Sequence, residues 1–429
     1  MPRFLATIMC ALSAALAAAD PGPQRLDLPT VLMMVHDHDP ALAAARADAR
    51  AAEQTARSAG SYLPPQLGLQ LMGLGPAAAD LPQSNQHQWT LTQDLPFPGR
   101  TWAQGRVAGR LAAAKAADAD SLEQQEYKDA RTAFYSLAGA EFLLRGLDSV
   151  SQATREMARL SSRRAGFGQL NRMGQFMDAM LAMEDSGVDG LRPMAQQQRK
   201  AAQAMLQRLM GTDPLLGLPP AGVSLDAMLA LPAPELAAAL KAAEERSPLL
   251  KGASASLQAA EAARGLALSG WLPDLMVQGS VTADQAGNEQ SGAMLALSLP
   301  WLWYPKQAGE AGAAAAAEDK ACADLQGARL ALREQVAAAV GDLNAAAESL
   351  RTAWTRTYPQ AARGLELARS GFRTTALGSS EILMAVQDYR TTEEGLAGLI
   401  AQWGEAQARL LMLTAAPLGA ADPDQGARP

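Results

Sequence analysis

The sequence predicts a mainly α-helical fold with a small β part, in which long antiparallel helices carry two pairs of strands. Aromatic residues make up only 5% of the 429 residues, and long alanine-rich stretches lack glycine and proline. Such composition is typical of extended helices that pack through small side chains. A strand that runs directly into a very long helix occurs twice, about two hundred residues apart, which indicates an internal duplication.

The first segment, residues 1–19, has the pattern of a secretory signal peptide. Arg3 precedes an apolar stretch, and Ala17–Ala19 fits an A-x-A cleavage site. Cys10 lies in a poor context for a lipoprotein cysteine, although lipidation of the N-terminus stays open. Cleavage would leave Cys322 as the one cysteine. No later apolar run in the sequence reaches the roughly 20 residues of a membrane-spanning helix, so any membrane crossing would use strands.

The first repeat is predicted over residues 28–211. Asp39-Pro40 predicts the start of its first helix, because an N-cap acid is followed by proline at the first helical position. A strand pair follows at about 65–95, then a long helix at 101–165 and a return helix at 172–211. The long helix would measure roughly 95 Å at 1.5 Å per residue, which no compact globular domain of this size contains.

The second repeat is predicted over residues 247–414, in the same order. Its strand pair lies at about 274–299, its long helix at 306–370 and its return helix at 379–414. Between the repeats, the proline-rich residues 212–246 are interpreted as an irregular belt around the middle of the helices. Residues 415–429 are predicted to be a disordered tail.

Both strand pairs alternate between apolar and polar residues. Leu67, Leu69 and Leu71 alternate with Gln66, Gly68 and Gln70, and the second pair repeats this with Leu275, Val277 and Val281. A half-buried soluble sheet and a transmembrane barrel strand both fit this pattern. The signal peptide and the lack of other predicted sheet favour the barrel. Because four strands cannot close a barrel, several chains would have to contribute to it.

The first strand-to-helix junction carries a recognisable motif. It reads Thr92-Gln93-Asp94-Leu95-Pro96-Phe97-Pro98-Gly99-Arg100, with Gln93, Pro96, Pro98 and Gly99 as its defining residues. The motif and the duplicated layout over residues 28 to 414 resemble the outer-membrane efflux channel family to which TolC belongs. The resemblance implies a homotrimer in the outer membrane, with a helical tunnel through the periplasm capped by a shared twelve-stranded β-barrel. It also implies an exporter that works with a periplasmic adaptor and an inner-membrane pump.

The turns between long and return helices are predicted to be the periplasmic tips, because they lie one helix length from the strands. In the resembled family such turns meet the adaptor. Arg373 and Glu381 match that family's pattern, whereas Thr375 and Gly378 depart from it. The alternative is that the tip glycines are simple helix C-caps. The predicted tip residues are Gly166, Gly168, Gly371, Arg373, Gly378 and Glu381.

A line of methionines on the first return helix offers soft thioether ligands suited to monovalent copper. Met173, Met177, Met180 and Met183 are spaced by four, three and three residues, as on one helical face. A helix-packing stripe is the more ordinary explanation, since methionine fills gaps between helices. Together with a loose likeness of the junction motif to metal-efflux members of the family, the stripe suggests a heavy-metal cation as cargo. Organic drugs are the alternative.

Enzymatic chemistry finds no support in the sequence, which lacks nucleophile-elbow, phosphate-loop and zinc-helix motifs. No cofactor is expected. Residues 36–39, His-Asp-His-Asp, are interpreted as a helix entry rather than a metal site, because residues two apart on a helix face different directions. A formal net charge of −7 gives no basic surface for nucleic acid.

Two other classes of protein stay open at this stage. One is a periplasmic coiled-coil adaptor or scaffold whose strands form a soluble sheet. Two hairpins and two strand pairs favour the channel over this reading, because an adaptor usually has a single helical hairpin. The other is a periplasmic metal-binding protein.

Overall fold

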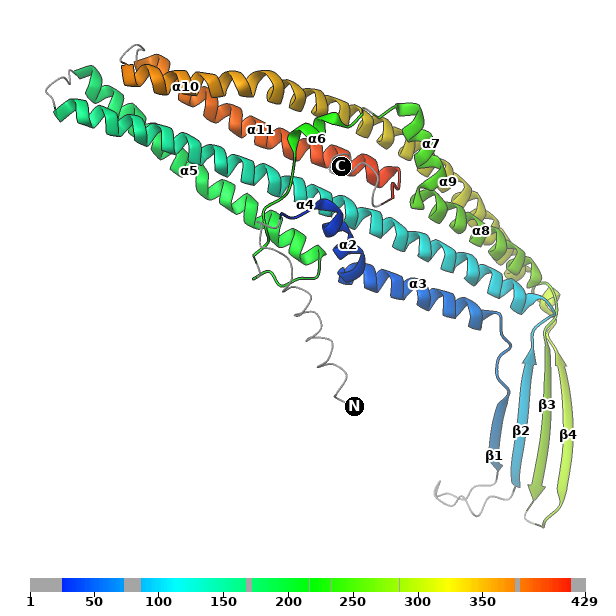
Figure 1. Cartoon of the computed structure of the whole chain (residues 1–429). Coiled ribbons are helices and arrows are strands. Elements are labelled where there is room, and N and C mark those ends of the chain that lie inside the picture. Colours follow the sequence, from blue (N-terminus) through cyan, green and yellow to red (C-terminus); the bar gives the residue numbers. More distant parts are fainter. Residues whose placement is uncertain are drawn as a thin grey trace, which may run out of the picture.

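The chain forms one elongated helical body from whose end a small sheet extends (Figure 1). The computed structural model describes residues 25–72, 86–166, 172–215, 217–232, 234–284, 286–374 and 379–417. The predicted mainly helical fold with a small antiparallel sheet is confirmed. The predicted signal peptide lies outside the described residues, as does the predicted tail from residue 418 onward.

The helices of the first half run in the order α2, α3, α4 and α5. Their bounds are α2 Leu28–His38, α3 Pro40–Ala59, α4 Arg100–Gly166 and α5 Arg172–Leu209. At 67 residues, α4 is a rod of about 100 Å. It packs against α3 near the sheet and α5 toward the far end, and it lies beside α8 and α11 of the second half (Figure 1).

The second half repeats this order with one interruption. Its helices are α6 Leu225–Ala230, α7 Leu236–Arg246, α8 Pro248–Ser269, the 3-10 turn η2 Pro300–Trp303, α9 Tyr304–Thr352, the π-helical turn η3 Ala353–Thr357, α10 Tyr358–Thr374 and α11 Ser379–Leu413. The long helix expected over 306–370 is present as helical backbone, but with a π turn that the expectation did not include. A π turn inserts an extra residue into the hydrogen-bond ladder and divides the helix into α9 and α10.

The predicted irregular belt over 212–246 is wrong in part, because α6 and α7 occupy much of it. α7 has 11 residues and ends at Arg246, so that only Ser247 separates it from the proline that opens α8. α2 likewise has 11 residues and ends just before Asp39-Pro40. Proline cannot continue the preceding helix but suits the first turn of the next, so each repeat begins with the same pair of helices.

The sheet has four antiparallel strands in the order β1-β2-β3-β4. The strands are β1 Gln66–Met72, β2 Gln86–Leu95, β3 Leu275–Asp284 and β4 Glu289–Leu297. β2 pairs with β3 along its whole length, from Gln86↔Asp284 to Leu95↔Leu275. The pairing of β2 with β3 therefore joins the two predicted strand pairs into a single sheet.

The hydrophobic core lies entirely between the helices. One cluster surrounds the middle of α4 and includes Phe134, Tyr135 and Trp403, and a second continues toward the tips around Leu147 and Val386. α4 and α11 approach closely at Gly404, where an added Cβ atom would stand 2.2 Å from the Cβ atom of Tyr135. None of the described helices is long and apolar enough to cross a membrane.

Candidate functional site: the two-faced sheet and its junction with the helices

The sheet has one apolar face to which all four strands contribute. Antiparallel partners point to the same side of a sheet, so the register decides which residues share a face. Apolar residues meet across the strands in the sets Leu67↔Leu91, Leu69↔Trp89↔Val281, Val277↔Leu295 and Leu275↔Leu297. These side chains lack cover from the helices: Leu67 is 70% exposed and Leu295 is 69% exposed. We call this surface the apolar face.

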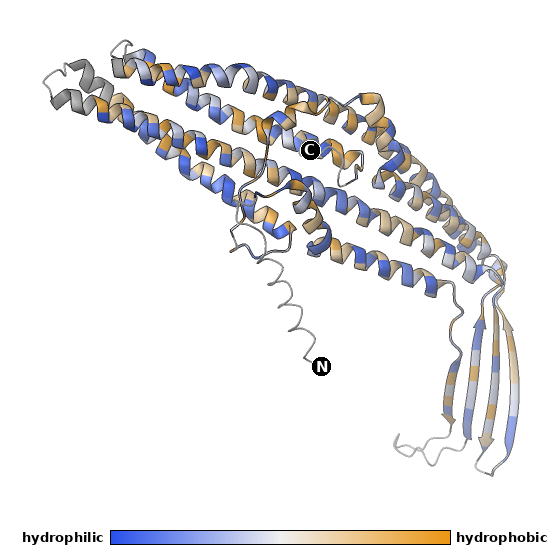
Figure 2. Ribbon diagram, in the orientation of Figure 1, coloured by the Kyte–Doolittle hydropathy of each residue, from blue (hydrophilic) through white to orange (hydrophobic). Residues whose placement is uncertain are grey.

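The opposite face is polar. Gln70 pairs with Gln88, which pairs with Thr282, which pairs with Gln290. Thr90 and Ser280 form the neighbouring row. Figure 2 shows hydrophilic and hydrophobic residues alternating along the strands. A sheet with one apolar and one polar face suits a boundary between lipid and water, as in membrane barrels.

The sheet is open at both edges. β1 pairs only with β2, and β4 pairs only with β3, among the strands that the structure describes. An edge strand presents backbone N–H and C=O groups that can pair with another chain. Each edge is thus a ready partner for the other edge of a second copy.

Gly99 turns the chain from β2 into α4. Its φ of +98° lies where residues with a side chain are strained, which explains glycine at this position of the motif. Pro96 and Pro98 lie just after β2, where their lack of a backbone N–H prevents further strand pairing. Gln93 donates from Nε2 to the carbonyl oxygen of Leu63, 2.8 Å away, and so ties β2 to the segment before β1.

Arg100 and Asp274 bind the two halves of the chain together at this junction. The Arg100 guanidinium forms an ion pair with Asp274 and donates to the carbonyl oxygens of Ser269 (2.7 Å) and Leu272 (3.0 Å). The other carboxylate oxygen of Asp274 accepts from the backbone N–H of Phe97 at 2.9 Å. The Arg100 side chain is 15% exposed and the Asp274 side chain is 40% exposed, so this contact is partly shielded from water. One carboxylate therefore fixes where β2 ends and α4 begins.

Sequence reasoning quoted Arg100 but missed Asp274. A usable signal exists, because Trp271-Leu272-Pro273-Asp274 aligns with Tyr62-Leu63-Pro64-Pro65 of the first repeat. Asp274 occupies the position that Pro65 occupies in the first repeat. No sequence motif indicated that Arg100 would be the partner of Asp274.

The predicted tip residues are only partly placed. Gly166 is the last residue of α4, while Gly168 and Gly378 lie outside the described residues. Gly371 and Arg373 belong to the end of α10 rather than to the turn, because the helix continues to Thr374. The expected start of the second turn at Gly371 is thus wrong. Glu381 lies exposed in the first turn of α11, where a negative charge is favourable.

The side chains of Met173 and Met177 lie outside the described part of the chain. Met180 is half-buried and Met183 is 65% exposed on α5. Within the described residues, no group of three or more His, Cys, Asp and Glu residues could hold a metal ion.

The segment His36-Asp37-His38-Asp39 links helices. Asp39 caps α3 by accepting from the N–H of Ala41 at 2.7 Å, as predicted for a helix entry. His36 contacts Glu123 and Tyr127 of α4 through Nδ1, at 2.9 and 2.7 Å. Burial raises the pKa of Glu123, but hydrogen bonds from Tyr127 and His36 outweigh it, so this pKa lies below its ordinary value.

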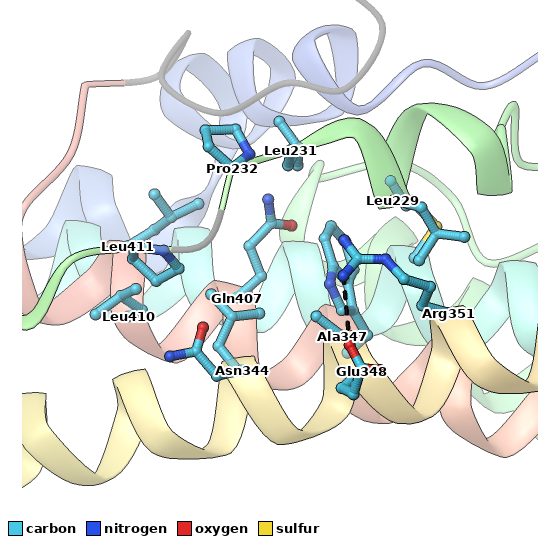
Figure 3. Close-up of a pocket in the computed structure, with 14 residues that line it drawn as sticks. Leu229, Leu231, Pro232, Asn344, Ala347, Glu348, Arg351, Gln407, Leu410 and Leu411 are labelled. Carbon is cyan, nitrogen blue, oxygen red and sulfur yellow. Dashed lines mark hydrogen bonds and ion pairs between the residues drawn. The ribbon is translucent and has the colours of Figure 1, made fainter.

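A cavity of about 560 Å³ opens beside the C-terminal ends of α9 and α11, under α6 and the segment that follows it (Figure 3). Its wall is mostly apolar, with Leu229, Leu231 and Leu410 among its residues. Arg351 donates to Glu348 at 3.3 Å along its edge.

Solved structures share this fold over nearly the whole chain. VceC of Vibrio cholerae, an outer membrane protein, is 17% identical with a TM-score of 0.71, covering 90% of this chain and 95% of its own. The MtrE outer membrane channel of Neisseria gonorrhoeae is 16% identical with a TM-score of 0.70, covering 90% and 88%. CusC, described as forming a transmembrane channel, is 14% identical with a TM-score of 0.74, covering 93% and 95%. The fold is therefore that of an outer-membrane channel.

Residues 239–416 match the family model described as outer membrane efflux protein. No curated protein matches the sequence. The family match and the shared fold confirm the resemblance predicted from the junction motif and the duplication. They also confirm the predicted outer-membrane location. As predicted, the matched proteins are channels and not enzymes.

Proposed function

We propose that three copies of the chain form one channel and that this channel is the outer-membrane part of a tripartite efflux system. The observation that carries the proposal is the open four-stranded sheet with a continuous exposed apolar face. Four strands with two free edges cannot persist in lipid, where each unpaired backbone group costs several kcal/mol. Pairing β4 of one copy with β1 of the next would close twelve strands in a trimer. The apolar face would then meet lipid, and the polar face would line a water-filled pore.

Fractionation and particle mass test this proposal together. The mature protein should fractionate with the outer membrane and solubilise in detergent as a particle of three chains, measured by light scattering with the detergent mass subtracted. A soluble monomer without bound detergent would contradict both the barrel and the trimer.

The helical body suits a periplasmic tunnel that meets partners at its far end. α4 is a rod of about 100 Å, so its end at Gly166 lies far from the sheet. We place the docking surface for a periplasmic adaptor at the two turns there, with an inner-membrane pump beyond it. The exposed position of Glu381 in the first turn of α11 is consistent with contact from another pair of helices.

A heavy-metal cation, monovalent copper or silver, is the cargo we propose. Exposed Met183 and half-buried Met180 leave thioether sulfur accessible on α5, and such soft ligands suit these ions. Deleting the gene should sensitise cells to copper or silver more than to detergents and dyes. The reverse pattern would replace the metal by organic drugs and leave the channel proposal intact.

A further inference from the structure

A groove of about 390 Å³ lies between α4, α10, α11 and the segment that leads into α6. It is separate from the sheet, the junction and the tips, and no function proposed above uses it. Its volume falls within the range of small-molecule sites in proteins.

The groove contains a buried carboxylate that lacks a full set of partners. Glu393 of α11 is 3% exposed, and it accepts hydrogen bonds from the hydroxyls of Tyr389 and Tyr358. Its Oε2 atom has no hydrogen-bond partner among the described residues. Gly146 of α4 makes room for this carboxyl group, because an added Cβ atom there would stand 2.6 Å from Oε2. The space that holds the carboxylate is thus created by the absence of a side chain.

A second carboxylate lines the same groove. Glu141 accepts from the N–H of Ala221 at 3.0 Å through Oε2, and its Oε1 forms an ion pair with Nε of Arg199 at 3.7 Å. Burial raises the pKa values of both Glu141 and Glu393 above their ordinary range. Arg199 offsets the charge of Glu141, whereas Glu393 forms no ion pair among the described residues. The exposed Arg145 lies over the Phe142 ring, with its guanidinium carbon 6.0 Å from the ring centroid.

Aromatic rings form the rest of the wall. Trp354 stacks on Tyr358 with ring centroids 5.2 Å apart, and Phe142 and Tyr389 each lie 6.1 Å from Tyr358. Trp354 belongs to the π turn, and its indole N–H donates to Asp226 at 2.9 Å. π turns inside helices frequently occur at functional sites. Here the turn directs an aromatic side chain into the groove.

We propose that this groove binds a small organic ammonium ion, with Glu393 as its counter-ion and the rings of Trp354, Tyr358 and Phe142 against its alkyl groups. Aromatic faces attract ammonium cations, and a desolvated carboxylate with a free lone pair strengthens the preference for positive charge. A metal ion fits less well, because two carboxylates and four rings provide too few oxygen ligands. The proposal concerns a site outside the sheet and stands independently of the assembly and cargo proposed above.

Calorimetric titration of the detergent-solubilised full chain with choline tests the proposal. Dimethylbutanol, the uncharged isostere with carbon in place of nitrogen, is the matched ligand. Choline should bind, and dimethylbutanol should bind at least about tenfold more weakly, because only choline carries the charge that the rings and carboxylate select. Equal binding of the two ligands, or no binding of choline, would overturn the proposal.

Two variants locate the site. Glu393→Gln keeps the shape but removes the charge, and Trp354→Leu removes the aromatic wall; each should weaken choline binding about tenfold. Glu366→Gln on α10 and Trp102→Leu on α4 make the same changes outside the groove and should leave binding unchanged. Circular dichroism identifies any variant that fails to fold, in which case the other variant decides. Unaltered binding in a folded Glu393→Gln or Trp354→Leu protein would place choline elsewhere.

Discussion

Arginine substitutions on the sheet test which face meets lipid. Leu69 lies in the middle of β1 on the apolar face, opposite Trp89, and is 50% exposed. Leu297 on β4 lies on the same face opposite Leu275 and is 54% exposed. An arginine facing lipid costs about 2–4 kcal/mol near the midplane, where Leu69 would lie, and less near the interface, where Leu297 at the end of β4 would lie. We expect Leu69→Arg and Leu297→Arg each to lower the yield of assembled channel.

The cost multiplies in the proposed trimer. Three distant and independent copies of Leu69→Arg would add to about 6–12 kcal/mol for each assembled barrel. Since about 1.4 kcal/mol corresponds to a tenfold change, even the lower value shifts the assembly equilibrium by roughly four powers of ten. Such a change exceeds any effect on the local stability of one exposed strand.

Gln70→Arg is the matched control, because it makes the same addition one residue away on the polar face. Gln70 pairs with Gln88, and in the proposed barrel its side chain would point into water. The assay is the amount of detergent-resistant oligomer in outer-membrane fractions, compared at equal expression. Equal yields of the three variants would refute the assignment of the two faces.

Two further predictions concern the tips and the helix packing. Gly378→Trp and Gly168→Trp should abolish efflux while oligomer yield and membrane insertion stay normal, and efflux that survives both changes would exclude the tips as the docking surface. Gly404→Ala should destabilise the helical body by about 1–3 kcal/mol because its Cβ atom would overlap Tyr135. Gly398→Ala, with open space around its Cβ position, is the control in thermal unfolding, and equal melting temperatures would contradict the packing described.

Local patterns in the sequence sufficed for much of the fold. The period-two alternation that includes Leu69 and Val277 predicted strands with one apolar face, and the register places these residues on one face. The two prolines that end the strand predicted a turn at Gly99. The positive φ of Gly99 explains why glycine is needed there. These features depend on neighbours along the chain, so the sequence contains their signal.

Contacts between distant residues left no such signal. The Glu393 carboxyl group occupies the space beside Gly146. The sequence shows that residue 146 is a glycine, but it does not indicate which distant side chain will pack against it. The π turn at Ala353–Thr357 did have a local signal that the sequence analysis did not use, because Pro359 lies two residues further on and has no backbone N–H for the helical ladder. α7 was missed because the prolines before it suggested an irregular segment.

The pair Arg100–Asp274 provides the last prediction. Asp274→Ala removes the ion pair and the hydrogen bond to the N–H of Phe97. Hydrogen bonds to charged groups contribute about 1.5–3 kcal/mol, and we expect a loss of stability of this size because the Arg100 side chain is only 15% exposed. Asp118→Ala is the control. Its ion pair with Lys115 lies on an exposed helix surface, where such pairs contribute less than about 1 kcal/mol.

A double-mutant cycle separates the ion pair from the other contacts of the two residues. Arg100→Met keeps the aliphatic stem and removes the charge, and it also loses the hydrogen bonds to Ser269 and Leu272. If the two side chains stabilise one another, the double variant should be less destabilised than the sum of the single variants by about 0.5–3 kcal/mol. Additive losses in thermal unfolding would mean that Asp274 acts only through Phe97. The two halves of the chain would then be joined at this point by β2–β3 pairing and not by the charge pair.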